Sequence, residues 1–111
     1  MQFAEGQGIL GRIRFRDGEM PEYDRTYLLI SVGPDYIEVL NVSTIRGKER
    51  KLLFPSNERL RSYRPPFLHP SFVKLDSLTR VPLSECGDLQ ILHSGKTLDL
   101  MELSRIKSLL S

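Results

Sequence analysis

The sequence predicts a small, mainly β domain that ends in one α-helix. Two runs rich in β-branched and aromatic residues, 27–32 and 36–42, flank the turn Gly33-Pro34-Asp35 and predict a hairpin. Near the C-terminus the apolar spacing changes from the period of a strand to that of a helix. Five to seven short strands and one late helix imply a strongly bent sheet or a partly open barrel, built as a single domain over residues 1–111.

The N-terminal third predicts one strand and one loop. Residues 11–16 alternate basic and apolar side chains with period two, which is typical of a half-buried strand. Asp17-Gly18 is a turn signal that ends it. Residues 17–24 are acidic and contain a proline, so we expect a loop there.

After the hairpin the chain predicts short strands around one long loop. Residues 51–54 predict a short strand, because they are mostly apolar and a proline follows them. Residues 56–70 contain three prolines and predict an irregular loop, a kind of segment that often carries function. Three more strands are expected at residues 71–75, 78–81 and 89–92.

The predicted helix closes the chain and covers the sheet. We expect Thr97 as its N-cap, and Asp99 and Glu102 lie in the first turn, where the helix dipole favours acids. The helical spacing places one apolar stripe against the core, made of Leu98, Met101, Leu103, Ile106, Leu109 and Leu110.

Composition excludes several classes of protein. The apolar runs are far shorter than the roughly 20 residues that cross a bilayer, and the chain does not start with a basic and then apolar leader. We therefore expect a cytoplasmic protein with no membrane partner. One cysteine and two histidines offer no disulfide and no metal-ligand spacing, so we expect neither a metal nor a cofactor, and Cys86 is expected in the core.

Positive charge is concentrated in one segment. Residues 46–64 carry seven bases and two acids, a net charge of +5 in a chain whose total is +2. Bases interleaved with Phe54 and Tyr63 suit single-stranded nucleic acid, because cations neutralise phosphates and rings stack on bases. The alternative is an ordinary solvated loop. The candidate phosphate contacts in this segment are Arg46, Lys48, Arg61 and Arg64.

The hairpin predicts a candidate site at one edge of the sheet. A hairpin places the start of its first strand near the end of its second, so Arg25 is expected to meet Ser43 and Thr44.

The order of these features resembles the MazF/PemK (Kid) family of toxin ribonucleases. The resemblance rests on Gly11, Ile13 and Phe15, an acidic loop, Arg25 opening residues 27–32, the strand that ends in Ser43-Thr44, residues 72–82, and the terminal helix. It implies an SH3-like barrel that forms homodimers and cuts single-stranded RNA without metal. It also implies a toxin-antitoxin system, in which an antitoxin protein neutralises the toxin by occupying its RNA groove.

The resemblance also implies roles for individual residues. Arg25 matches the family's arginine for proton transfer or phosphate stabilisation, and Ser43 or Thr44 matches its strand-end hydroxyl. Asp76 and Ser77 match an acidic residue followed by a polar one. Arg80 lies one position away from where the family has a downstream arginine. The chain departs from the family at Thr26, which stands where the family has proline.

The chemistry of RNA cleavage leaves the catalytic base open. The 2′-OH of RNA is the nucleophile, so the protein needs a proton acceptor, a proton donor and positive groups for the phosphate. Arg25 stays protonated and suits the phosphate. The candidate bases are Glu22, Asp24, His69 and Asp76.

Other interpretations remain open. If these residues have only structural roles, Arg25 forms an ion pair with Glu22 or Asp24, and Asp76-Ser77 is an ordinary turn. A non-catalytic barrel that binds protein or nucleic acid is the second functional hypothesis, and gyrase inhibition is the third.

Overall fold

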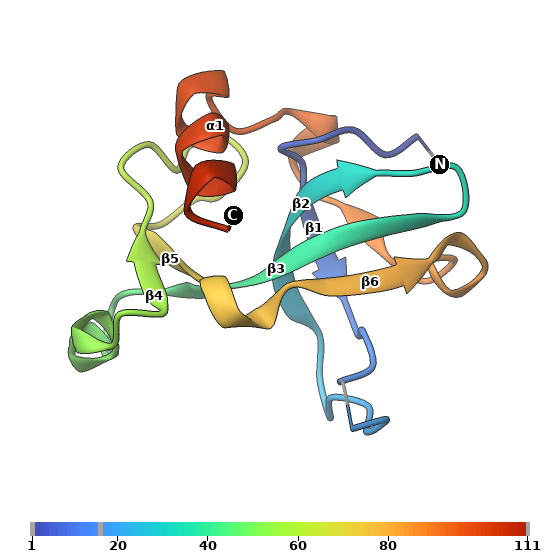
Figure 1. Ribbon diagram of the computed structural model, residues 1–111, viewed down its shortest axis with the longest axis horizontal. Helices are drawn as coiled ribbons and strands as arrows, with labels where there is room; N and C mark the ends of the chain where they lie inside the picture. The colour runs from blue at the N-terminus through green and yellow to red at the C-terminus, as the bar shows by residue number, and fades with distance from the viewer. Residues whose placement is uncertain (1, 16, 111) are drawn as a thin grey trace.

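The computed structural model describes residues 2–15 and 17–110, and its fold is one antiparallel sheet with a helix on one side (Figure 1). The sheet runs in the order β4-β5-β3-β2-β1-β7, with β6 also paired to β3, and it is open rather than closed. The strands are β1 (Gly8–Gly11), β2 (Arg25–Val32), β3 (Tyr36–Thr44), β4 (Asn57–Arg59), β5 (Ser71–Lys74), β6 (Thr79–Pro82) and β7 (Gln90–Ile91). The helices are the 3₁₀ turns η1 (Glu49–Leu53), η2 (Leu75–Ser77), η3 (Leu83–Glu85) and η4 (His93–Gly95), and α1 (Leu100–Leu109).

The predicted hairpin is confirmed and forms the centre of the sheet. β2 and β3 pair from Thr26 with Val42 to Val32 with Ile37. Residues 27–30 are all buried, which explains why this run is apolar without alternation: both faces of the hairpin are covered.

Each face of the hairpin supports its own core. One core contains Leu28, Leu40 and Val73 beneath α1, which adds Leu103 and Ile106. The other core lies on the opposite face, where the curling sheet packs these side chains together: Ile9, Ile13, Tyr27, Leu29, Ile37, Val39, Val81, Cys86 and Leu89. The expected core position of Cys86 is confirmed.

The helix is confirmed, but its start and part of its apolar face were predicted wrongly. Asp99 is the N-cap instead of Thr97, because its carboxylate accepts the Glu102 backbone N–H at 3.1 Å. Met101 is 83% exposed and Leu109 is 44% exposed. A helix this short meets the core with only a narrow stripe, so these two side chains remain in solvent.

Two predicted strands are wrong for reasons that lie outside the local sequence. β1 ends at Gly11, which pairs with Arg25, the first residue of β2, so residues 12–15 have no partner strand; Arg16 lies outside the described residues. Residues 51–54 belong to η1 and the turn after it, and the short strand β4 comes later, within the segment that was expected to be a loop.

The other expected elements are present. Residues 17–24 form a loop, as predicted, and the remaining strands appear as β5, β6 and β7 with bounds shifted by a residue or more. Among the helices in the described part of the chain, none is long and apolar enough to cross a membrane.

A buried ionic network fastens the loop after β4 to α1. Glu102 is 5% exposed and accepts the backbone N–H of Arg61 at 2.5 Å. Arg105 binds Glu102 at 2.8 Å, Glu58 at 2.6 Å and the carbonyl of Arg59 at 3.0 Å. The hydrogen bonds from Arg105 hold the pKa of Glu102 below its ordinary value, against the opposing effect of burial.

Candidate functional site

A cavity of about 220 Å³ lies where β2 begins and β5 ends, and we call it the Arg25 pocket. It takes residues from the segment after β1, from the hairpin, and from β5 and η2. Its lining residues are Ile13, Arg14, Phe15, Arg25, Tyr27, Asn41, Lys74, Asp76, Ser77 and Thr79.

The register of the sheet explains why these residues meet. Tyr27 is paired with Asn41, and alternation along β2 puts Arg25 on the same face as Tyr27. Val73 of β5 is paired with Val42, so Lys74, one residue further, comes beside Asn41. The sheet therefore places two cations and a tyrosine on one face.

Arg25 has no carboxylate partner among the described residues. Its Nε is buried and makes no hydrogen bond with any of them. Its guanidinium carbon lies 5.4 Å from the ring centroids of both Phe15 and Tyr23. Asp24 lies 3.8 Å from Arg12 instead, so the expected alternative of an Arg25–Asp24 pair is not what the structure contains. The guanidinium has free hydrogen-bonding capacity inside a pocket.

Lys74 adds a second, perturbed cation to the pocket. Burial lowers the pKa of Lys74, and the positive charges of Arg25, Lys51 and Lys48 lower it further, while Asp76 acts in the opposite direction. A lysine with a lowered pKa gives up its proton more readily than an exposed one, and a bound anion would relieve the repulsion it experiences.

Tyr27 supplies a neutral hydroxyl. Its side chain is 5% exposed. Burial raises the pKa of Tyr27, partly offset by a backbone hydrogen bond with Ile13 and by the charge of Arg25. The phenol therefore keeps its proton in the pocket.

Asp76 and Ser77 both lie at the pocket, as the sequence predicted, but only one has a free side chain. The Ser77 hydroxyl donates to the Lys74 carbonyl at 2.6 Å and accepts the Asn41 backbone N–H at 2.8 Å. Ser77 thus anchors η2 to β3. The carboxylate of Asp76 is exposed at the same pocket, where it can accept a hydrogen bond.

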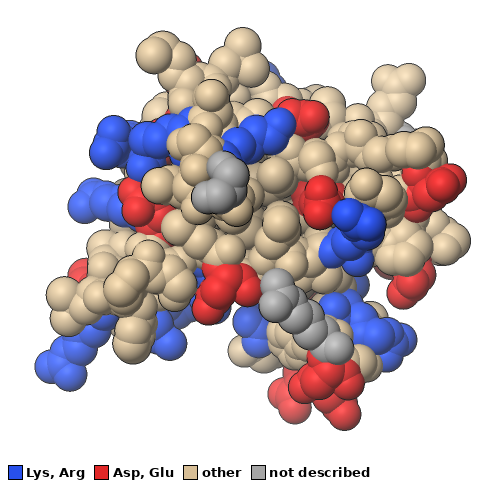
Figure 2. All heavy atoms as spheres, in the orientation of Figure 1, with Lys and Arg blue, Asp and Glu red and all other residues tan. Residues whose placement is uncertain are grey.

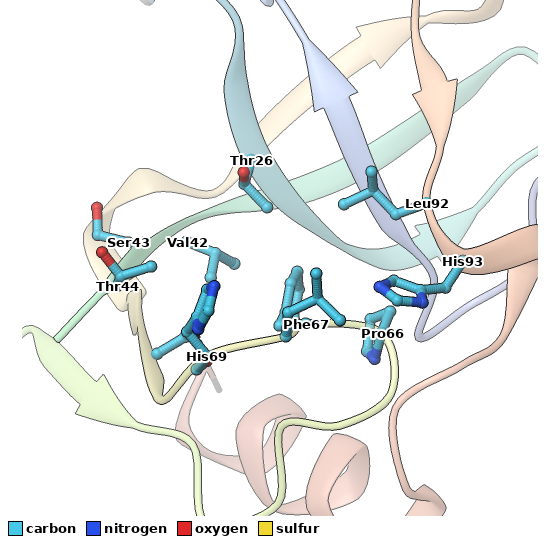
Figure 3. Close-up of a pocket in the computed structure, with 11 residues that line it drawn as sticks. Thr26, Val42, Ser43, Thr44, Pro66, Phe67, His69, Leu92 and His93 are labelled. Carbon is cyan, nitrogen blue, oxygen red and sulfur yellow. The ribbon is translucent and has the colours of Figure 1, made fainter. Parts of the chain in front are cut away.

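The strand-end hydroxyls do not both face Arg25. One further step of the β2–β3 register puts Ser43 opposite Arg25, although Ser43 does not line the pocket. Thr44 points to the other face, because neighbouring residues of a strand alternate. There it borders a second cavity with His69, while the Ser43 hydroxyl points away from the rings (Figure 3).

That second cavity, which we call the histidine cavity, measures about 210 Å³. Figure 3 shows His69 and His93 on opposite sides of Phe67, with Thr26 above them. The lining residues are Thr26, Val42, Ser43, Thr44, Pro66, Phe67, Leu68, His69, Ser71, Leu92 and His93.

Arg80 does not line the Arg25 pocket, although it borders a neighbouring hollow that shares Phe15 and Thr79 with that pocket. It is paired with Glu38 across β3 and β6, its guanidinium is 3.8 Å from that carboxylate, and it stacks over Tyr36 at 4.1 Å. Thr79, the residue before it, lines the pocket. The Arg80 side chain therefore occupies the opposite face of β6.

The basic segment forms one end of the molecule. Figure 2 shows Lys and Arg side chains gathered over β4, η1 and the loop that follows β4. Lys48 is close enough to act electrostatically on Lys74. Arg46 borders a hollow beside His69, and Arg61 and Arg64 are exposed in the loop. Cations of this segment thus lie near the Arg25 pocket and near the histidine cavity.

Tyr27, Asn41 and Lys74 are among the pocket residues that the sequence did not single out as site residues. The alternation along residues 71–75 places Lys74 on the face opposite Val73. That Lys74 lies near Arg25, however, depends on how β2, β3 and β5 pair with one another, which the local sequence does not specify. Within the described residues, no group of three or more His, Cys, Asp and Glu side chains could hold a metal ion.

Comparison of the chain with protein-family models, with curated proteins and with solved structures found no match.

Proposed function

We propose that this protein is a toxin-like endoribonuclease of the MazF/PemK type, with an SH3-like barrel, that cleaves single-stranded RNA without metal. The observation that supports it most is the Arg25 pocket, where a guanidinium whose Nε has no partner among the described residues lies with Lys74, Tyr27 and Asp76. A scissile phosphate is the anion that this set suits, because the Arg25 guanidinium stabilises its developing charge while Lys74 and Tyr27 lie in the same pocket to transfer protons.

The proposed reaction divides its proton transfers between named residues. The 2′-oxygen attacks phosphorus, the bond to the 5′-oxygen breaks, and a 2′,3′-cyclic phosphate forms. Neutral Lys74 takes the 2′-OH proton, and its lowered pKa makes this form more accessible. The Tyr27 phenol, which is protonated before the reaction, gives its proton to the departing 5′-oxygen, and the protonated Lys74 returns a proton to the tyrosinate through solvent after the products leave. Arg25 remains protonated and holds the phosphate oxygens.

The partners follow from the family resemblance. A cognate antitoxin protein would block the Arg25 pocket, and the toxin would act as a homodimer. Light scattering at several concentrations tests the dimer.

Cleavage of a mixed pool of single-stranded RNA in chelator tests the proposal. Wild type is expected to produce 2′,3′-cyclic phosphate ends and Arg25→Ala is not, whereas Arg80→Ala is the matched control that still cuts, because Arg80 is paired with Glu38 on another face. Intact RNA after incubation with folded wild-type protein, across varied sequences, would rule the nuclease out.

The second candidate is a non-catalytic barrel that binds RNA or protein through the same pocket. It is favoured by one observation: the family resemblance assigns Ser43 or Thr44 to the site, and neither residue lines the pocket. Salt-sensitive RNA binding without cleavage in the same assay would support this candidate.

A further inference from the structure

The histidine cavity has the dimensions and walls of a site for one flat ring. Its volume of about 210 Å³ is below the roughly 300 Å³ at which drug-sized pockets begin. Pro66, Phe67 and Leu92 provide apolar walls. Gly8 lets the loop lie close against β1, since a Cβ there would come within 3.1 Å of the Pro66 side chain.

Polar side chains surround these apolar walls and remain available. Thr26 and Thr44 contribute hydroxyls, and His69 and His93 contribute imidazoles. None of the four side chains forms a hydrogen bond within the described part of the chain. A flat heterocycle that offers donors and acceptors at its edge matches this arrangement, because the rings stack on its faces and the hydroxyls contact its edge.

The backbone beside the cavity adopts an uncommon conformation. His93 and Ser94 have φ angles of 51° and 54°, in the left-handed region that non-glycine residues rarely occupy. Such residues concentrate at functional sites. Here the conformation turns η4 so that His93 borders the cavity.

Cations lie immediately outside the cavity. Thr44 and His69 also line a neighbouring hollow that contains Arg46 and Arg59. A ring in the cavity would therefore have positive charge within reach of an attached phosphate.

We propose that the histidine cavity is a nucleotide subsite, in which the base lies against Phe67 and His93 and its phosphate contacts Arg46 and Arg59. This proposal rests on the proposed function and adds a second contact for the same RNA strand. Thr26 follows Arg25 in β2, so the two sites flank the same end of the hairpin from opposite faces. The scissile phosphate would lie at Arg25 and a neighbouring base in the cavity.

Proton NMR of the two histidine rings tests the subsite without reference to cleavage. The chain has only two histidines, and both line the cavity, so His69→Ala and His93→Ala assign the two Cε1–H signals. Each of the four nucleoside monophosphates is titrated, with ribose 5-phosphate as the control that lacks a base. We expect at least one nucleotide to shift both signals saturably, and Thr44→Val to weaken that binding about fivefold, whereas Thr97→Val leaves it unchanged.

Two results would overturn the subsite: no saturable shift with any nucleotide, or the same shifts with ribose 5-phosphate. Neither depends on RNA cleavage. If no nucleotide shifts the histidine signals but the protein still cuts RNA, only the subsite is rejected. If nucleotides shift the histidine signals but the protein leaves RNA intact, the nuclease is rejected and a nucleotide-binding protein remains.

Discussion

Two arginines of this protein have opposite surroundings. Arg105 is 19% exposed and is bound by Glu102, Glu58 and a backbone carbonyl. Arg25 has a buried Nε that no described residue satisfies, and its guanidinium carbon lies 5.4 Å from the ring centroids of both Phe15 and Tyr23. Since buried polar groups are nearly always paired, the difference indicates that Arg105 completes the fold and that Arg25 is available for a ligand.

The strongest test of this difference is Arg25→Met. This substitution keeps much of the apolar stem and removes the phosphate donors, so we expect RNA cleavage to fall about 10³-fold. The free energy of unfolding should change by no more than about 1 kcal/mol, because Arg25 forms no ion pair with the described residues and loses only its contacts with the rings of Phe15 and Tyr23. Single-turnover cleavage and urea unfolding measure the two effects. A large loss of stability with normal activity would make Arg25 structural.

Arg105→Met should have the reverse profile. It leaves the Glu102 carboxylate buried without its cation, which costs about 3 kcal/mol of unfolding free energy. Urea unfolding at neutral pH measures the loss, and Lys107→Met is the control on the same helix, since Lys107 binds the more exposed Glu5. If Arg105→Met and Lys107→Met were equally stable, the ionic network around Arg105 would not stabilise the fold.

The same network predicts sensitivity to acid. The folded-state pKa of Glu102 is below its ordinary value of 4.5. Its contribution to stability is therefore complete above about pH 4.5 and is lost as the pH falls through the depressed folded-state pKa. Glu102→Gln should be less stable than wild type at neutral pH, and the difference should shrink in acid. A difference that does not vary with pH would contradict this.

Lys74→Arg separates binding from proton transfer at the pocket. The substitution keeps the positive charge but cannot accept a proton at ordinary pH, so we expect cleavage to fall about 10²-fold with RNA affinity retained. Wild-type cleavage should rise with pH toward the pKa of Lys74, which lies below 10.5, and the variant should lose this rise. Lys96→Arg is the exposed control. Full activity of Lys74→Arg would show that Lys74 is not the proton acceptor and only contacts the phosphate.

The smallest effect is expected from the exposed basic loop. Arg61→Ala removes one expected phosphate contact from the basic segment, so RNA affinity should weaken about threefold. The slope of log affinity against log salt concentration should become less steep by about 1. Binding isotherms at several salt concentrations measure both. An unchanged slope would remove Arg61 from the RNA path.

The sequence predicted what depends on neighbouring residues along the chain. The hairpin and the helix follow from local period and turn chemistry, and both are present. Residues 12–15 have the pattern of a strand but no partner, because β2 begins at Arg25. Pattern alone cannot supply a pairing partner.

The same limit applies to the candidate site. Arg25, Asp76 and Ser77 were predicted and lie at one pocket, but Lys74 joins them only through the register of β3 and β5. Thr44 is the more instructive case. Neighbouring residues of a strand face opposite ways, so period two already indicates that Ser43 and Thr44 do not both face Arg25.

Nitrogen-15 NMR of the arginine Nε–H groups compares Arg25 and Arg105 most directly. The titrant is a single-stranded RNA oligonucleotide whose 2′-OH groups are replaced by hydrogen, so that it binds without being cut. The Arg25 signal should shift saturably and the Arg105 signal, held by Glu102 at 2.8 Å, should not move. Saturable oligonucleotide binding that leaves the Arg25 signal unchanged would contradict the assignment of Arg25 to the phosphate.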